Sequence, residues 1–110
     1  MNVSFEEIGA VAVTFAREGC QSGHVCKMGG NGKVVACAEG DKFCGIVENC
    51  RGDHAAVRVA GFATVSFSGS LGVGYADLCA DGNGGVKAGS GREYLVVAVD
   101  EAAATAVIKL

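Results

Sequence analysis

"GNGKV" at residues 30–34 returns as "GNGGV" at residues 82–86, 52 positions later in the same chain. Three further matches keep the same order along the sequence, at offsets of 51, 51 and 50. They pair "SGHVCKM" (22–28) with "VGYADLC" (73–79), "GDKFCGIV" (40–47) with "GREYLVVA" (91–98), and "AAVRV" (55–59) with "TAVIK" (105–109). Each match is weak alone because Gly, Ala and Val are abundant. Their collinearity predicts a duplicated unit of about 35 residues, which we place at about residues 22–59 and 73–110.

The size and composition of the chain fit a closed, pseudo-symmetric sheet. A chain of 110 residues forms one domain, and two repeats are too few for a solenoid, which needs about three. The 18 Gly, the absence of Pro and the short Val and Ala runs are typical of short strands joined by tight turns. We therefore predict an all-β fold, a small β-barrel or sandwich of about nine or ten short strands, with an N-terminal arm at residues 1–10 and a single β domain at residues 11–110.

Alternation of apolar and polar residues locates the strands. "VAVTF" (11–15) alternates as a half-buried strand does. The residues around Asn31 and Gly32 predict a hairpin turn, because this pair adopts the positive φ of a tight primed turn. The longest alternating run is "AAVRVAGFATVSF" (55–67), in which Gly61 predicts a bulge or bend. Near the C-terminus, "DEAAATAV" (100–107) has a helix start signal, but its repeat partner is a turn into a strand, and we predict a strand there.

Charge and hydropathy argue against two classes of partner. The formal net charge is −3 and the nine basic residues are scattered. The sequence therefore shows no cluster of basic residues that would bind a nucleic-acid backbone. No apolar run approaches the ~18 residues that cross a bilayer, and we expect no membrane partner. The N-terminal "MNVSFEEIGAVAV" carries two glutamates and no basic region, which is unlike a secretory signal.

The six cysteines have no C-x-x-C spacing, so redox and zinc-ribbon motifs are absent. Without an export signal we expect reduced thiols, and buried small hydrophobes are the ordinary role of free cysteines. If the cysteines are such core thiols, replacing Cys37 or Cys44 with Ser should lower the stability by about 1–3 kcal/mol. Five cysteines fall within residues 20–50, and a metal site of irregular spacing stays open as an alternative, although we predict no metal ligands.

The chain shows no catalytic signature. His24 and His54 are the only histidines, and nothing around any cysteine resembles a Cys–His nucleophile pair. The glycine turn lacks the spacing of a phosphate loop, and "RGD" (51–53) has a sufficient explanation as a turn. We therefore predict no enzyme, no catalytic residues and no cofactor. One enzyme-linked alternative stays open, a lipoyl- or biotinyl-like carrier or small ligand-binding β-module that presents Lys42 on a hairpin turn.

Two stretches, "GNGKVVACAEGDKFCGIV" (30–47) and "AAVRVAGFATV" (55–65), resemble the small capsid decoration (head cement) proteins of tailed bacteriophages. In those proteins a Gly-turned strand leads to a G-D turn, a G-V strand and an alternating V-x-V-x-G strand. The resemblance covers about residues 10–110. The matching pieces are Gly40-Asp41, Gly45-Ile46-Val47, Val57 to Gly61, Leu71 to Leu78, and "GREYLVVAV" (91–99).

The resemblance implies a non-enzymatic structural protein, made in the bacterial host cytoplasm, that binds the outside of the expanded capsid. Its partners would be the major capsid protein and two further copies of itself in a homotrimer, and its place would be the exterior of the virion. An N-terminal arm that adds a strand to a neighbouring sheet edge would supply the contact. The expected contact residues are Asn2, Val3, Phe5, Ile8, Val11 and Val13.

Overall fold

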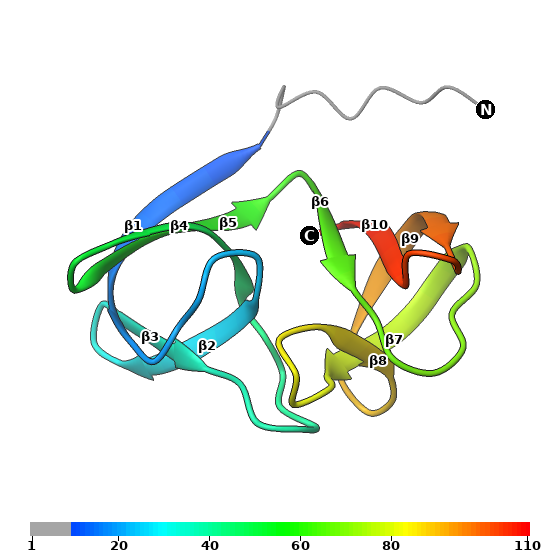
Figure 1. Ribbon diagram of the computed structural model, residues 1–110, viewed down its shortest axis with the longest axis horizontal. Helices are drawn as coiled ribbons and strands as arrows, with labels where there is room; N and C mark the ends of the chain where they lie inside the picture. The colour runs from blue at the N-terminus through cyan, green and yellow to red at the C-terminus, as the bar shows by residue number, and fades with distance from the viewer. Residues whose placement is uncertain (1–9) are drawn as a thin grey trace.

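The computed structural model describes residues 10–110, which form ten β-strands in two five-stranded sheets and contain no helix. The all-β prediction is confirmed. The first sheet contains β1 (Val11–Glu18), β2 (Val25–Gly30), β3 (Lys33–Ala36), β4 (Gly45–Arg51) and β5 (His54–Ala60). The second contains β6 (Phe62–Ser66), β7 (Gly74–Ala80), β8 (Val86–Ala88), β9 (Arg92–Asp100) and β10 (Thr105–Lys109). The two sheets lie side by side along the long axis of the molecule (Figure 1).

Both sheets follow the same strand order. The first runs β1-β3-β2-β4-β5 and closes into a barrel, because β1 pairs with β5 on one side and in parallel with β3 on the other. The second runs β6-β10-β9-β7-β8. With β6 to β10 corresponding to β1 to β5, this is the order of the barrel read in the opposite direction from its first strand. Each half thus adds one preceding strand, β1 or β6, to the four strands of its predicted repeat unit.

The closing contacts of the two halves also correspond. In the barrel, Arg17 of β1 lies opposite Val34 of β3 in the parallel pairing. In the second half, Phe67, just after β6, forms a single parallel bridge to Val86 of β8. Val34 and Val86 close the two "GNG" stretches of the sequence, and both are fully buried. The recurring motif therefore marks the place where the third strand of each half contacts the first strand, or the residue that directly follows it.

Gly61 separates the two sheets. It has φ +95, and a Cβ atom built on it would lie 2.7 Å from the Cα of Ala10. The long alternating run at residues 55–67 is thus two strands, β5 of the barrel and β6 of the second sheet, and the chain changes sheets at the bend. At the hairpin between β2 and β3, Gly32 has φ +65, whereas Asn31 does not have positive φ, so the turn is not the type I′ form that needs two such residues.

The larger core occupies the second half and receives side chains from the barrel half. Its large buried members include Leu78, Tyr94 and Ile108, and Phe43 reaches in from the barrel half. The rings of Phe43 and Tyr94 stack with centroids 4.8 Å apart, and the Tyr94 hydroxyl donates to the Phe43 carbonyl at 3.1 Å. The barrel has its own smaller core, made of Cys20, Cys26, Val34, Val47, Ala55 and Val57. Within the described residues, no helix is long and apolar enough to span a membrane.

Candidate functional site

The first half of β1 extends beyond the closed part of the barrel. Parallel pairing with β3 begins only at Ala16, whereas antiparallel pairing with β5 starts at Val11. Residues 11–15 therefore have a described partner strand on one side only, and Figure 1 shows β1 projecting away from the barrel. The exposed fractions of Val11 and Val13 are 48% and 38%. These are two of the predicted contact residues. The other four, Asn2, Val3, Phe5 and Ile8, lie outside the described residues.

The hydrogen-bond pattern shows which backbone groups of β1 point to its open edge. The Arg17 amide donates to the Asp53 carbonyl beside β5, and the Ala16 amide donates to the Gly32 carbonyl on the opposite side. Because amides alternate between the two edges of a strand, the amides and carbonyls of Ala12 and Thr14 face the open edge. No strand in the described part of the chain pairs with them. This edge presents a short template for an additional strand.

The side chains of the same segment continue the inner face of the barrel. Phe15 packs against the small barrel core, and so does Val59. Val11 and Val13 have the same parity along β1 as Phe15. The projecting segment therefore combines an open backbone edge with exposed apolar side chains, the two features that a strand-adding partner uses.

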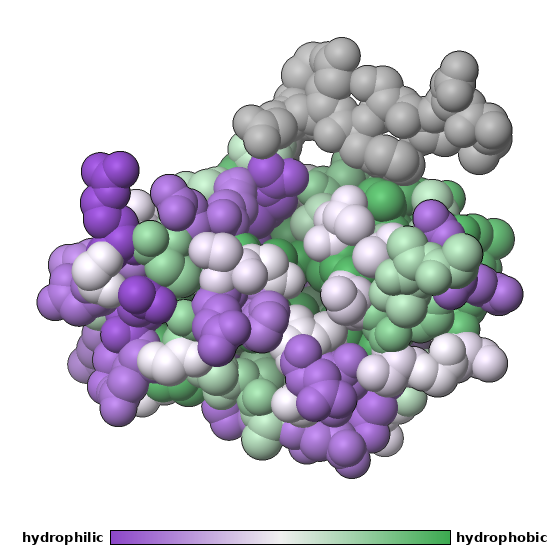
Figure 2. Space-filling model, in the orientation of Figure 1, coloured by the Kyte–Doolittle hydropathy of each residue, from purple (hydrophilic) through white to green (hydrophobic). Residues whose placement is uncertain are grey.

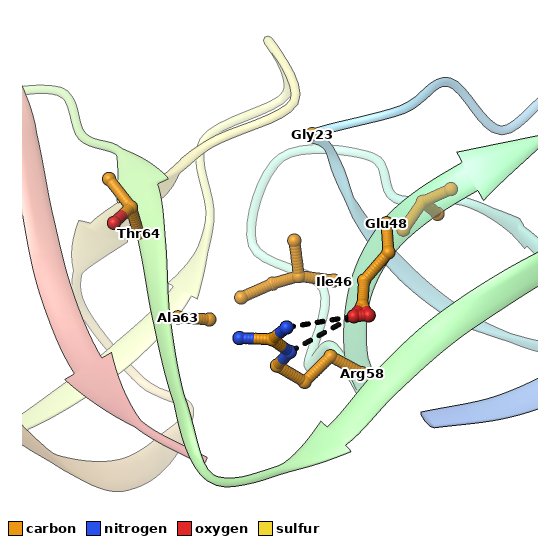
Figure 3. A pocket seen from close by; sticks show the side chains of 7 residues that line it. Gly23, Ile46, Glu48, Arg58, Ala63 and Thr64 are labelled. Carbon is orange, nitrogen blue, oxygen red and sulfur yellow. Dashed lines mark hydrogen bonds and ion pairs between the residues drawn. The ribbon is translucent and has the colours of Figure 1, made fainter. Parts of the chain in front are cut away.

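A groove of about 330 Å³ lies between the two halves (Figure 3). Arg58 of β5 spans it: its guanidinium donates to the Glu48 carboxylate at 2.9 Å and to the Phe62 carbonyl at 2.8 Å. The Arg58 side chain is only 15% exposed. Arg58 thus ties the barrel to the first residue of β6. The labelled lining residues are Gly23, Ile46, Glu48, Arg58, Ala63 and Thr64.

Sequence reasoning did not identify this groove, although one signal was present. Arg58 is the one charged residue in the alternating run at residues 55–67. A charge in such a run needs a partner when it is buried. The sequence does not say that the partner is Glu48, nor that the strand ends at a bend where the Phe62 carbonyl is within reach.

Figure 2 shows hydrophilic residues gathered over the barrel half and hydrophobic ones more frequent over the second half.

Lys42 does not occupy a hairpin turn. It is exposed and lies in the connection between β3 and β4, which are not neighbours because β2 lies between them. The connection is held against β7: the Gly40 amide donates to the Ala80 carbonyl at 2.9 Å, and the Ala80 amide donates to the Asp41 carbonyl at 2.8 Å. The expected hairpin placement of the carrier alternative is therefore wrong.

All six cysteines are free thiols in the structure. Cys20, Cys26 and Cys79 are buried, whereas Cys37 and Cys44 are half-buried at the edge of the two cores. Cys37 and Cys44 each pack against a core without being fully buried, so the premise of core thiols holds only in part for these two residues. Both lie in or next to the loop before β4, where side chains have solvent on one side. The described residues contain no cluster of three or more His, Cys, Asp or Glu side chains arranged to hold a metal ion.

Two half-buried thiols differ strongly in acidity. Burial raises the pKa of Cys37 to about 11, with the nearby Asp41 carboxylate adding to the effect. A hydrogen bond from the Cys26 thiol lowers the pKa of Cys44 to about 7, against an opposing effect of burial. The lowered pKa favours the thiolate form of Cys44, and thiolate is the nucleophilic form of cysteine.

The two histidines lie in different surroundings. His54 is exposed, with its Nδ1 2.8 Å from the Asp53 carboxylate. His24 covers Gly84, where an added Cβ atom would lie 2.5 Å from the imidazole ring. Both positions have a structural explanation in turns and packing.

No family model matches the chain, and no curated protein matches it either.

Proposed function

We propose that this chain is a non-enzymatic structural protein that binds the outside of an expanded bacteriophage capsid and stabilises it, as trimers over the junctions of the major capsid protein. The observation that carries the proposal is the projecting half of β1, with its open edge at Ala12 and Thr14 and its exposed Val11 and Val13. Such an edge gains main-chain hydrogen bonds when a partner adds a strand, and the valines supply apolar area. The acidic balance of the chain suits a surface that faces away from the genome.

The main test is co-sedimentation of the purified protein with capsids of the candidate major capsid protein, before and after expansion. We expect saturable binding to expanded capsids alone, with a copy number that is a multiple of three. Absence of binding to either form would overturn the proposal.

The duplication offers a matched pair of variants for the β1 edge. Thr14 and Thr64 lie at corresponding positions, 50 residues apart, on β1 and β6. The Phe67 amide, beside β6, donates to the Ala104 carbonyl, so by alternation the Thr64 amide points away from β10, as that of Thr14 points away from β5. Proline is tolerated where a strand amide faces an open edge.

We expect Thr14→Pro to abolish capsid binding and Thr64→Pro to retain it. Thermal melting should show that both variants are folded. Equal binding by the two variants would show that the β1 edge is not the contact. The carrier alternative gains no support from the position of Lys42, and intact mass of the protein from its native host tests it directly: a covalent group mapped to Lys42 would replace our proposal.

A further inference from the structure

Cys26 and Cys44 are neighbours across a pair of strands. Cys26 lies in β2 directly opposite Gly45 of β4, and Cys44 immediately precedes that glycine. The Cys44 amide donates to the Cys26 carbonyl at 2.8 Å. Directly opposite Cα atoms in an antiparallel pair are about 4.5–5.5 Å apart. Cys44 precedes the first residue of β4 and so lies outside the regular alternation of that strand. Its side chain packs on the cluster that contains Cys26, and the two thiols interact by a hydrogen bond, so the pair lies within the Cα span that a disulfide bridges, about 4.4–6.8 Å.

The two thiols differ in access to solvent. Cys26 is fully buried in the barrel core, and its Sγ lies 3.7 Å from the Gly45 carbonyl. Cys44 packs against the same core from its edge and is half-buried. A reagent from solvent therefore reaches Cys44 first, and Cys26 is placed behind it. The interaction between the thiols lowers the pKa of Cys44 and raises that of Cys26, which makes Cys44 the stronger nucleophile at neutral pH.

We propose that Cys44 and Cys26 form a thiol–disulfide exchange site for small disulfides of the glutathione class, with Cys44 as the attacking thiol and Cys26 as the resolving thiol. The Cys44 thiolate attacks one sulfur of the small disulfide, a new S–S bond forms, the old S–S bond breaks, and one small thiolate leaves. Cys26 then gives its proton to that thiolate or to water and attacks the Cys44 sulfur, and the second small thiolate leaves. Overall, two protein thiols are oxidised to one disulfide, and one small disulfide is reduced to two thiols.

The other cysteines are less suited to either role. Cys37 is half-buried like Cys44, but burial raises its pKa to about 11, so its thiol is mostly protonated at neutral pH. Cys79 is buried in β7 of the second half and is not a member of the barrel core. Cys50 is half-buried with its Sγ 3.8 Å from the Cys20 carbonyl, and it is the rival that the experiment has to distinguish.

The experiment treats the reduced full-length protein with oxidised glutathione at neutral pH and maps the products by peptide mass spectrometry. We expect a Cys26–Cys44 disulfide in the wild-type protein and in the control Cys37→Ala. We expect Cys26→Ala to accumulate a glutathione adduct on Cys44, because the resolving thiol is missing, and Cys44→Ala to form neither product. A first adduct on Cys50 or Cys37, or no disulfide in the wild type, would overturn the proposal.

A second measurement needs no variant and so does not depend on how Cys26→Ala folds. The folded wild-type protein is alkylated with a short pulse of iodoacetamide at neutral pH, and the labelled cysteines are quantified. Allowing for the lower intrinsic reactivity of a more acidic thiolate, we expect Cys44 to react about 100-fold faster than Cys37. Equal rates at the two positions would overturn the role of Cys44 as the attacking thiol.

Discussion

The barrel half and the second half share one strand order but close it to different extents. In the barrel, β1 and β3 make three parallel residue pairs, whereas the corresponding contact in the second half is the single bridge between Phe67 and Val86. The barrel interior is filled by small residues such as Cys26 and Ala55. The second half contains Tyr94, Leu78 and Ile108, together with contributions from the other half. A small barrel closes around small side chains, and a larger core keeps the same topology open.

The difference also sets the division of stability between the halves. Val25, Phe43 and Ile46 belong to the barrel half by sequence, yet they pack in the core of the second. The barrel half therefore supplies part of the packing that its duplicate needs, and the two halves should unfold together.

Replacing the ring that joins the halves should have the largest effect. Phe43 is 4% exposed and stacks on Tyr94, so Phe43→Ala removes a buried ring and leaves a cavity. We expect a loss of about 3–5 kcal/mol in the free energy of unfolding, measured by denaturant titration. The matched control is Met28→Ala, at a side chain that is 46% exposed, for which we expect a change within about 0.5 kcal/mol.

The same experiment distinguishes coupled from independent halves. Fluorescence of the two tyrosines, Tyr75 of β7 and Tyr94 of β9, reports on the second half, and backbone circular dichroism reports on both halves. Coupled halves give coincident transitions in the wild type. Separate transitions in the wild-type protein would show that the stacked pair does not join the halves energetically.

Asp81 stabilises a turn that the barrel half builds without a carboxylate. The position corresponds to Gly29 in the first unit. Asp81 is 7% exposed, and it accepts hydrogen bonds from the Ser68 hydroxyl at 2.7 Å and from the amides of Asn83 and Gly85 at 2.7 and 3.0 Å. Burial alone would raise the pKa of this carboxyl, but these hydrogen bonds lower it below its ordinary value.

We expect Asp81→Asn to lower the free energy of unfolding by about 2 kcal/mol at neutral pH, because a charge-assisted acceptor of buried donors is lost. The lowered pKa in the folded state means that this contribution is present above the ordinary pKa of about 3.9 and is lost as pH falls through the folded value. The difference between wild type and Asp81→Asn in denaturant titrations should therefore shrink on acidification. A difference that stays constant down to pH 3 would assign the effect to packing.

The sequence was sufficient for the fold class and for most strands, because alternation and glycine turns are local signals. It did not reveal that each duplicated unit has a fifth strand. β1 and β6 share only Thr14 and Thr64 at matching positions, and the bend at Gly61 is hidden inside a continuous alternating run. The open edge of β1 was also beyond reach, because it depends on where β3 ends relative to β1. The burial of individual cysteines could not be predicted for a related reason: the loop before β4 has no alternation from which the inward-facing side chains can be identified.

Serine variants of two cysteines compare a buried thiol with a half-buried one. Cys26 is fully buried in the barrel, whereas Cys37 is half-buried beside the larger core. In Cys26→Ser the shorter C–O bond places the hydroxyl farther from the Gly45 carbonyl than the present 3.7 Å of the sulfur, so the hydroxyl stays poorly paired. We expect a loss of about 1–2 kcal/mol in the free energy of unfolding.

Cys37→Ser should cost less than about 0.5 kcal/mol, because solvent can hydrogen-bond the new hydroxyl. Denaturant titration under reducing conditions measures both variants without interference from disulfides. Equal losses would mean that the barrel interior accommodates a hydroxyl as readily as its surface does, and the small barrel core would then owe its stability to the closed backbone pairing rather than to the packing of its side chains.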